Sequence, residues 1–185
     1  AHDTNAYPNL YSTEFMISGT AIDADFANAK LYGDFDGTWS GSGSGESLLG
    51  TGTVAGGRVT FGPGINRFIP AGQTLHLYLV AALSTTLTDQ AIIVATVQAN
   101  KISVRRSSSG ASTENGSDLT STGAITTNVV ADRFVVTGAP ASVAQYSALG
   151  TNITVKATDS YGNTDKGYTG QVYFTANDPL ATLSW

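Results

Sequence analysis

Asp132-Arg133-Phe134-Val135-Val136-Thr137-Gly138 is a run in which β-branched and aromatic residues favour extended backbone and a terminal glycine favours a turn. Two similar runs follow at 152–158 and 170–175. Three strands in this order are typical of the opening of an immunoglobulin-like β-sandwich, which takes about seven strands. We therefore expect residues 131–185 to form only the N-terminal part of such a domain. Its apolar face would be covered by further chain or by a neighbouring copy.

Strand signals also fill the chain before this run. Leu75-His76-Leu77-Tyr78-Leu79 alternates strictly, which predicts a strand whose three leucines point inward. Residues 91–97 are continuously apolar and predict a central strand, while 14–19 and 101–105 alternate, the latter as a candidate edge strand. The predicted fold class is therefore all-β, with a β-sandwich over residues 14–130 followed by the incomplete immunoglobulin-like sandwich.

Turn residues separate these strands. Ala55-Gly56-Gly57 lies between candidate strands at 48–54 and 58–61, which predicts a hairpin. Residues 20–30 show no helical apolar face and are interpreted as a loop or a short turn. Only Val129-Val130-Ala131 separates the two modules, so we expect them to be held nearly end to end.

Residues 1–13 precede the first confident strand. We interpret them as an N-terminal extension, either a linker or capping strand, or a donor strand that completes the sandwich of a neighbouring copy.

Composition excludes several classes of protein. Charged residues make up 12% of the chain and the net charge is −5, and the only basic cluster is Lys101, Arg105 and Arg106. This cluster is too small to follow a phosphate backbone, so nucleic acid is not an expected partner. The chain has no cysteine, which rules out disulfides, and no apolar run of the roughly 20 residues that a membrane span requires. A weakly charged, acidic β-rich chain favours an extracellular or cell-surface location.

One continuous motif supports this interpretation. Residues 159–175, Asp-Ser-Tyr-Gly-Asn-Thr-Asp-Lys-Gly-Tyr-Thr-Gly-Gln-Val-Tyr-Phe-Thr, are followed by Asn177-Asp178-Pro179. This run resembles the bacterial Ig-like repeats of large cell-surface and S-layer-type proteins. A weaker resemblance to another domain of such proteins covers 14–128, through runs at 31–34, 48–53 and 69–74. The resemblance implies a structural repeat and no catalytic activity.

Paired carboxylates are the candidate metal ligands. They are Asp23 with Asp25 and Asp34 with Asp36, with Glu46 nearby. Loop carboxylates two residues apart can converge on calcium, which takes 6–8 oxygen ligands. Solvated or capping turns remain the alternative, and for Asp159 and Asp165, which flank Tyr161-Gly162-Asn163, the turn explanation is the stronger one.

Little in the sequence could support catalysis. His2 and His76 are the only side chains with a pKa ordinarily near neutrality, and no nucleophile elbow, phosphate loop or zinc-binding helix motif is present. We therefore predict that the protein is not an enzyme. Trp39, Tyr7 and Tyr11 are candidate aromatic platforms for a surface glycan, and Asn115 and Asn152 lie in glycosylation sequons.

These observations predict a structural module of an extracellular microbial surface-layer or filament protein, whose partners are copies of itself or neighbouring modules of a longer chain. Two alternatives stay open. One is a pilus-type subunit joined by donor-strand exchange, and the other is an accessory or glycan-binding module of a secreted enzyme or adhesin.

Overall fold

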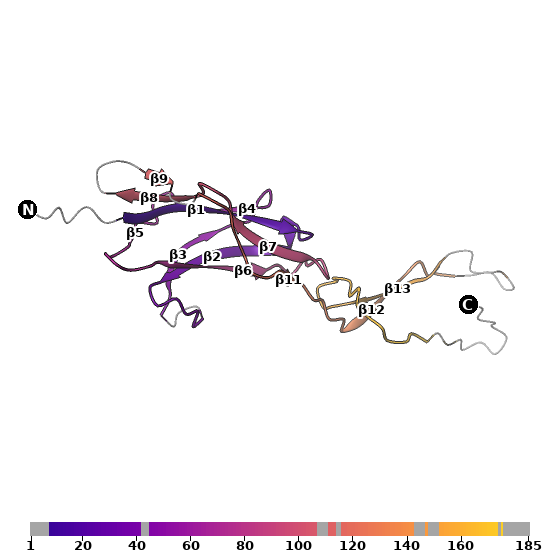
Figure 1. Ribbon diagram of the computed structural model, residues 1–185. Helices are drawn as coiled ribbons and strands as arrows, with labels where there is room; N and C mark the ends of the chain where they lie inside the picture. Colours follow the sequence, from indigo (N-terminus) through magenta and orange to yellow (C-terminus); the bar gives the residue numbers. More distant parts are fainter. Residues whose placement is uncertain are drawn as a thin grey trace, which may run out of the picture.

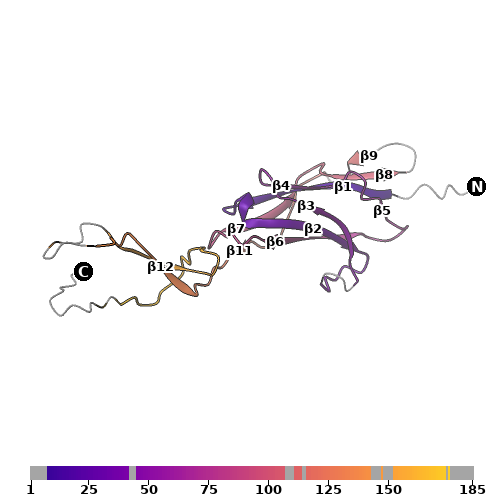
Figure 2. The same ribbon diagram turned by 180° about the vertical axis from the view of Figure 1, so that it is seen from behind.

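The regular secondary structure of the described residues is almost entirely antiparallel β-sheet. The computed structural model describes residues 8–41, 45–106, 111–113, 116–142, 147, 152–173 and 175. A two-layered sandwich comes first, and a two-stranded sheet follows it at the opposite end of an elongated molecule (Figures 1 and 2). The predicted fold class, an all-β chain with a β-sandwich, is confirmed.

The strands are β1 (Pro8–Gly19), β2 (Phe26–Asp34), β3 (Ser47–Gly52), β4 (Arg58–Phe61), β5 (Arg67–Phe68), β6 (His76–Leu83), β7 (Ile92–Val97), β8 (Ile102–Arg106), β9 (Ala111–Thr113), β10 (Leu119–Thr120), β11 (Ile125–Thr126), β12 (Arg133–Thr137) and β13 (Thr154–Thr158). One short 3₁₀ helix, η1 (Asp23–Asp25), precedes β2. No helix in the described part of the chain is long and apolar enough to cross a membrane.

The long strand β1 organises the larger sheet. Leu10 and Thr13 each pair with β8 on one side and with β5 or β4 on the other, and Met16 pairs with both β4 and β7. Strands β10 and β11 pair with the far edge of β7, and β9 pairs with β8. The smaller sheet has the order β3-β2-β6 and packs against this layer (Figure 1).

The core lies between the two sheets. Phe15 and Phe61 meet edge to face with ring centroids 6.0 Å apart, and Leu31 is fully buried opposite them. The glycines of β3 allow this packing, since a Cβ added to Gly52 would lie 2.7 Å from Cγ2 of Val59.

The turn at Ala55-Gly56-Gly57 forms as predicted. Ala55 and Arg58 exchange backbone hydrogen bonds of 2.9 and 3.1 Å, and Gly56 and Gly57 have φ angles of 59° and 68°, where glycine is favoured. The predicted hairpin pairing is wrong, because β3 pairs with β2 while β4 pairs with β1. The turn therefore carries the chain from one sheet to the other.

Three other local predictions are corrected. The loop or short turn expected over 20–30 is found only at 20–25, where η1 forms, because 26–30 already belong to β2. Strand β8 is not an edge, since it pairs with both β1 and β9. Residues 8–13 lie inside β1 rather than in an extension outside the first sandwich. A proline at the first position of the strand and a sequence of mixed polarity concealed this element.

The second module contains β12 and β13 paired over their full length. The pairs Phe134↔Ala157 and Val136↔Val155 bring four apolar side chains to one face. Phe134 packs edge to face on Tyr168 at 5.4 Å, yet both it and Val136 remain exposed. The strand expected at 170–175 is not formed by 170–173, which pair with no other described strand.

Candidate functional site: the joint between the two modules

The carboxylate of Asp89 lies at the centre of the contact between the modules. This residue precedes β7 and is only 3% exposed. Its Oδ1 accepts a 2.7 Å hydrogen bond from the Val129 amide, and its Oδ2 accepts one of 2.7 Å from the Lys166 amide. The Lys166 Nζ donates in turn to the Asp89 carbonyl at 3.0 Å. One side chain thus joins the end of the first module, the linker and a loop of the second module.

Asn163 forms a second connection. Its Nδ2 donates to the Thr85 carbonyl at 2.8 Å, and its Oδ1 accepts from the Leu87 amide at 2.9 Å. Both ends of the amide group therefore bind the β6–β7 loop of the first module. Asp159 holds Asn163 in place, since its two oxygens accept from the backbone amide and the Nδ2 of Asn163 at 2.9 and 2.8 Å.

The linker itself is anchored on both sides. The Ala131 amide donates to Oδ2 of Asp165 at 3.1 Å, and Val129 is buried. Just before the linker, Thr127 Oγ1 donates to the Thr88 carbonyl at 2.6 Å and accepts from the Ala91 amide at 2.8 Å. The expected short end-to-end connection is thus held by hydrogen bonds on each side of residues 129–131.

The charge at this joint is stabilised by oriented donors. Burial raises the pKa of Asp89, but hydrogen bonds from the Val129, Lys166 and Gln90 amides and the Lys166 charge outweigh it, so the pKa is lowered. Burial also raises the pKa of Asp159, but hydrogen bonds from Asn163 and neighbouring amides have the larger, opposite effect, so this pKa is lowered too. Both carboxylates are ionised at neutral pH. The turn explanation for Asp159 and Asp165 is confirmed, and both also serve the joint.

The four aspartates expected to bind calcium play different parts. Asp23 accepts from the Gly56 and Gly57 amides at 2.5 and 2.9 Å, and Asp25 accepts from the Ile22 and Thr88 amides at 2.8 and 2.6 Å. These two carboxylates therefore hold loops of the protein together. No three His, Asp or Glu side chains in the described residues are grouped so that they could hold a metal ion.

Asp34 and Asp36 belong to a separate region. Their carboxylates accept from the Gly37 and Thr38 amides at 3.0 and 2.8 Å. Asp34 pairs with His76 across β2 and β6, and continuing the β2–β3 register by one residue places Glu46 on its other side. Directly opposed residues share a face, so these three side chains form a row on the outer face of the smaller sheet.

Two carboxylates in that row are buried with an oxygen that accepts no hydrogen bond from the described residues. Asp34 is 5% and Glu46 is 7% exposed, and the unpaired atoms are Oδ2 and Oε2. Burial, and then the neighbouring Asp34 carboxylate, raises the pKa of the Tyr78 phenol. The Asp36 and Glu46 charges raise it further. The sequence signal for this row was only the proximity of Glu46 to the predicted loop.

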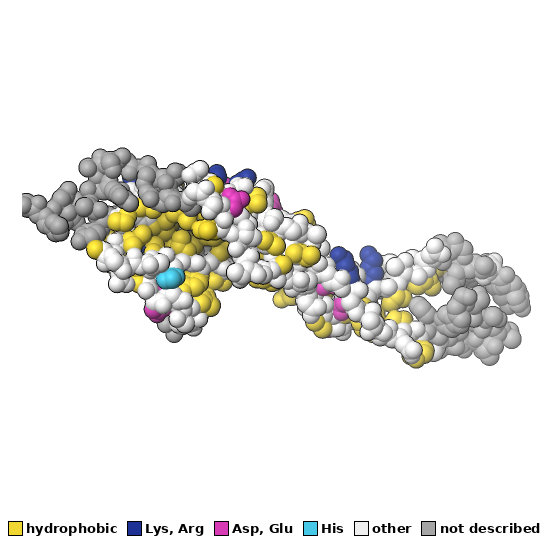
Figure 3. All heavy atoms as spheres, viewed as in Figure 1, with side chains coloured by type: hydrophobic (Ala, Val, Ile, Leu, Met, Phe, Trp, Pro, Cys, Tyr) yellow, Lys and Arg dark blue, Asp and Glu magenta, His cyan; other side chains and the backbone are white. Residues whose placement is uncertain are grey.

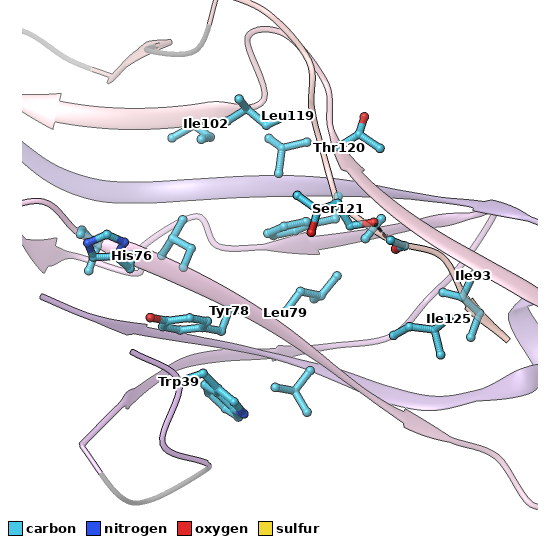
Figure 4. Close-up of a pocket in the computed structure, with 18 residues that line it drawn as sticks. Trp39, His76, Tyr78, Leu79, Ile93, Ile102, Leu119, Thr120, Ser121 and Ile125 are labelled. Carbon is cyan, nitrogen blue, oxygen red and sulfur yellow. Dashed lines mark hydrogen bonds between the residues drawn. The ribbon is translucent and has the colours of Figure 1, made fainter. Parts of the chain in front are cut away.

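Trp39 folds back over the same face. Its ring lies 5.5 Å from that of Tyr32 and 5.2 Å from that of Tyr78, and the side chain is 41% exposed. Figure 4 shows Trp39 beside Tyr78, with His76 on the same strand. His76 thus lies on the face opposite to Leu77 and Leu79, as the alternation predicted.

The remaining candidate residues are accounted for as follows. Lys101 and Arg58 form ion pairs with Glu14 at 2.9 and 2.7 Å, and Arg105 stacks on Tyr11 with its Cζ 3.5 Å from the ring centroid. Asn152 is exposed just before β13. Tyr7, His2 and Asn115 lie outside the described residues.

Comparison with known proteins was negative. No family model, curated protein or solved structure matches this chain. Function must therefore be argued from the geometry.

Proposed function

We propose that the chain is a structural module of an extracellular microbial surface-layer or filament protein, and not an enzyme. Its role would be to set the spacing and direction of successive β-domains. The observation that carries this proposal is the hydrogen-bonded joint, in which Asp89 and Asn163 fix the second module against the first. The low content of charged residues supports an extracellular setting, with which the absence of cysteine is compatible.

A stiff joint is what distinguishes a spacer from a tethered accessory module. Contacts between domains of one chain are commonly small, so relative motion is the usual expectation. Here short side chains bind main-chain groups across the joint. Asp89 accepts from the Val129 and Lys166 amides, and Asn163 binds the Thr85 carbonyl and the Leu87 amide. Bending at residues 129–131 would break several of these hydrogen bonds at once.

The absence of cysteine allows a direct test. Spin labels on single cysteines introduced at the exposed positions Thr51 and Lys156 would report the distance between the modules. We expect a narrow distance distribution in the parent protein and a broad one in Asn163→Ala. Asp36→Asn, in an exposed turn away from the joint, is the matched control and should stay narrow. A distribution in the parent as broad as in Asn163→Ala would overturn the proposal.

A glycan-binding role is the second candidate. The supporting observation is the partly exposed ring of Trp39, which lies on two tyrosines beside the buried carboxylates of Asp34 and Glu46. Retention on a panel of immobilised surface glycans should then be lost in Trp39→Ala and kept in Leu48→Ala, which changes an exposed residue of β3. Equal retention of both variants, or none by the parent, would discard this role.

A further inference from the structure

We propose that a hollow in the first module, together with the free edge of β6, binds an extended segment of a second copy of this chain. The segment is 170–173, Gly-Gln-Val-Tyr. This inference rests on the proposed assembly function and names the surface that would carry it.

The hollow lies between the two sheets. It has a volume of about 860 Å³ and opens beside β6 (Figure 4). Most of its lining is apolar and comes from both layers, including Leu77, Leu79, Ile93, Val97, Ile102 and Ile125. Figure 3 shows these apolar surfaces gathered in a depression between the layers. Clefts of about 300–1,000 Å³ with a mostly apolar lining are typical of binding sites.

The strand bordering the hollow has an unpaired edge. In the described part of the chain, β6 pairs with β2 along its length and with no strand on its other side. The opposite layer ends in β10 and β11, which have two residues each and leave Leu119 and Ile125 exposed. An added strand could pair with β6 and place alternate side chains in the hollow, as in β-strand addition.

The same chain contains an extended segment that fits this description. Residues 170–173 are uncharged, with Val172 and Tyr173 as the two large side chains of largely apolar character, and they pair with no described strand. Val172 is 40% and Tyr173 is 78% exposed. An uncharged segment with exposed Val and Tyr side chains suits the lining of the hollow, which contains no Asp, Glu, Lys or Arg among its described residues.

The contact between residues 170–173 and the hollow must form between two molecules. The segment lies with β12 and β13 at the end of the molecule away from the hollow (Figures 1 and 2). The joint prevents the second module from folding back, so only another copy can supply the segment. The two surfaces differ, so the contact is head to tail and generates an open chain of subunits.

The structure also argues against the donor expected from the sequence. Residues 8–13 pair with β8 across most of their length, and Asn9 and Leu10 pair also with β5. They cannot leave the sheet without breaking β1, so the expected donor strand over 1–13 is wrong for this part.

The test is association of the full chain, measured by light scattering during size exclusion over a range of concentrations. We expect the parent to associate and Val172→Asp to associate at least tenfold more weakly. Ala95→Phe, which fills the hollow from β7, should have the same effect. Leu48→Asp places the same charge on an exposed residue of β3 and should associate like the parent. A monomeric parent, or association unchanged in Val172→Asp, would overturn the proposal.

Hydrogen exchange locates the contact. Amides of β6 should become at least tenfold more protected as the parent associates. They should also be protected when a peptide of residues 168–175 is added to monomeric Val172→Asp, which keeps the test valid if Ala95→Phe fails to fold. Protection confined to β12 and β13 would refute docking at the hollow. The rigidity of the joint is tested separately, by measuring the spin-label distance in Val172→Asp. A narrow distance distribution together with failed docking would reject the docking proposal and leave the rigid joint standing.

Discussion

Removing the Asp89 carboxylate should detach the second module and weaken the first. Asp89→Ala leaves the Val129 and Lys166 amides without their acceptor in a buried site. Hydrogen bonds to a charged group contribute about 1.5–3 kcal/mol each, and such losses are not additive. We therefore expect the free energy of unfolding to fall by about 3–5 kcal/mol at pH 7 in urea titrations followed by circular dichroism.

The difference in the free energy of unfolding between the parent and Asp89→Ala should change with pH in one direction. The pKa of Asp89 is lowered in the folded state, so its stabilising contribution is present above its unfolded pKa of about 3.9. The contribution is lost as the pH falls towards the folded pKa. The gap between parent and Asp89→Ala should therefore be constant from pH 5 to pH 7 and narrow by about 1 kcal/mol at pH 3. A loss below about 1 kcal/mol at pH 7, or a gap that widens on acidification, would refute the reasoning.

Four further variants test other parts of the structure. In the presence of a chelator, Glu46→Gln should raise the melting temperature by about 2–4 °C, because it removes a buried charge beside Asp34 while the amide oxygen can still accept from Ser40. A melting temperature of Glu46→Gln below that of the parent in chelator would contradict this. If calcium raises the melting temperature of the parent but not that of Glu46→Gln, a cation binds at Asp34 and Glu46. Gly52→Ala should lower the free energy of unfolding in urea by about 1–3 kcal/mol, because its Cβ would lie 2.7 Å from Val59 Cγ2. Gly56→Ala is the control: its Cβ would contact no other atom, so this variant measures only the cost of placing Ala at a φ of 59°. Asp25→Asn should lower stability by about 1–3 kcal/mol by weakening the bonds from the Ile22 and Thr88 amides, and calcium should not restore it.

The elements that sequence predicted well are those whose pattern is local. Alternation at 75–79 and the apolar run at 91–97 report the faces of single strands, and these became β6 and β7. The turn at Ala55 to Gly57 was predictable because two consecutive glycines suit positive φ. The sheet to which each flanking strand belongs was not, since β4 pairs with a strand more than forty residues earlier.

The missed elements depend on distant partners. Residues 20–30 suggested a loop because Asp23 and Asp25 leave them without an apolar face, but Asp25 accepts from the Thr88 amide 63 residues away. The contacts at the joint were hard to predict for the same reason. The turn built by Asp159 and Asn163 was predictable from adjacent residues, whereas its partners at 85–89 lie in another module.

The position of β1 also constrains the order in which the protein can acquire its structure. This first strand forms the middle of the larger sheet, and its partners β7 and β8 end at Val97 and Arg106. A chain that emerges N-terminus first from a ribosome can therefore pair parts of β1 with β4 and β5 early, but the other side of β1 stays unpaired until β7 and β8 have followed. Such long-range closure slows folding and exposes a bare strand meanwhile. A factor that holds extended chain near Pro8 would shield this strand until its remaining partners have been synthesised.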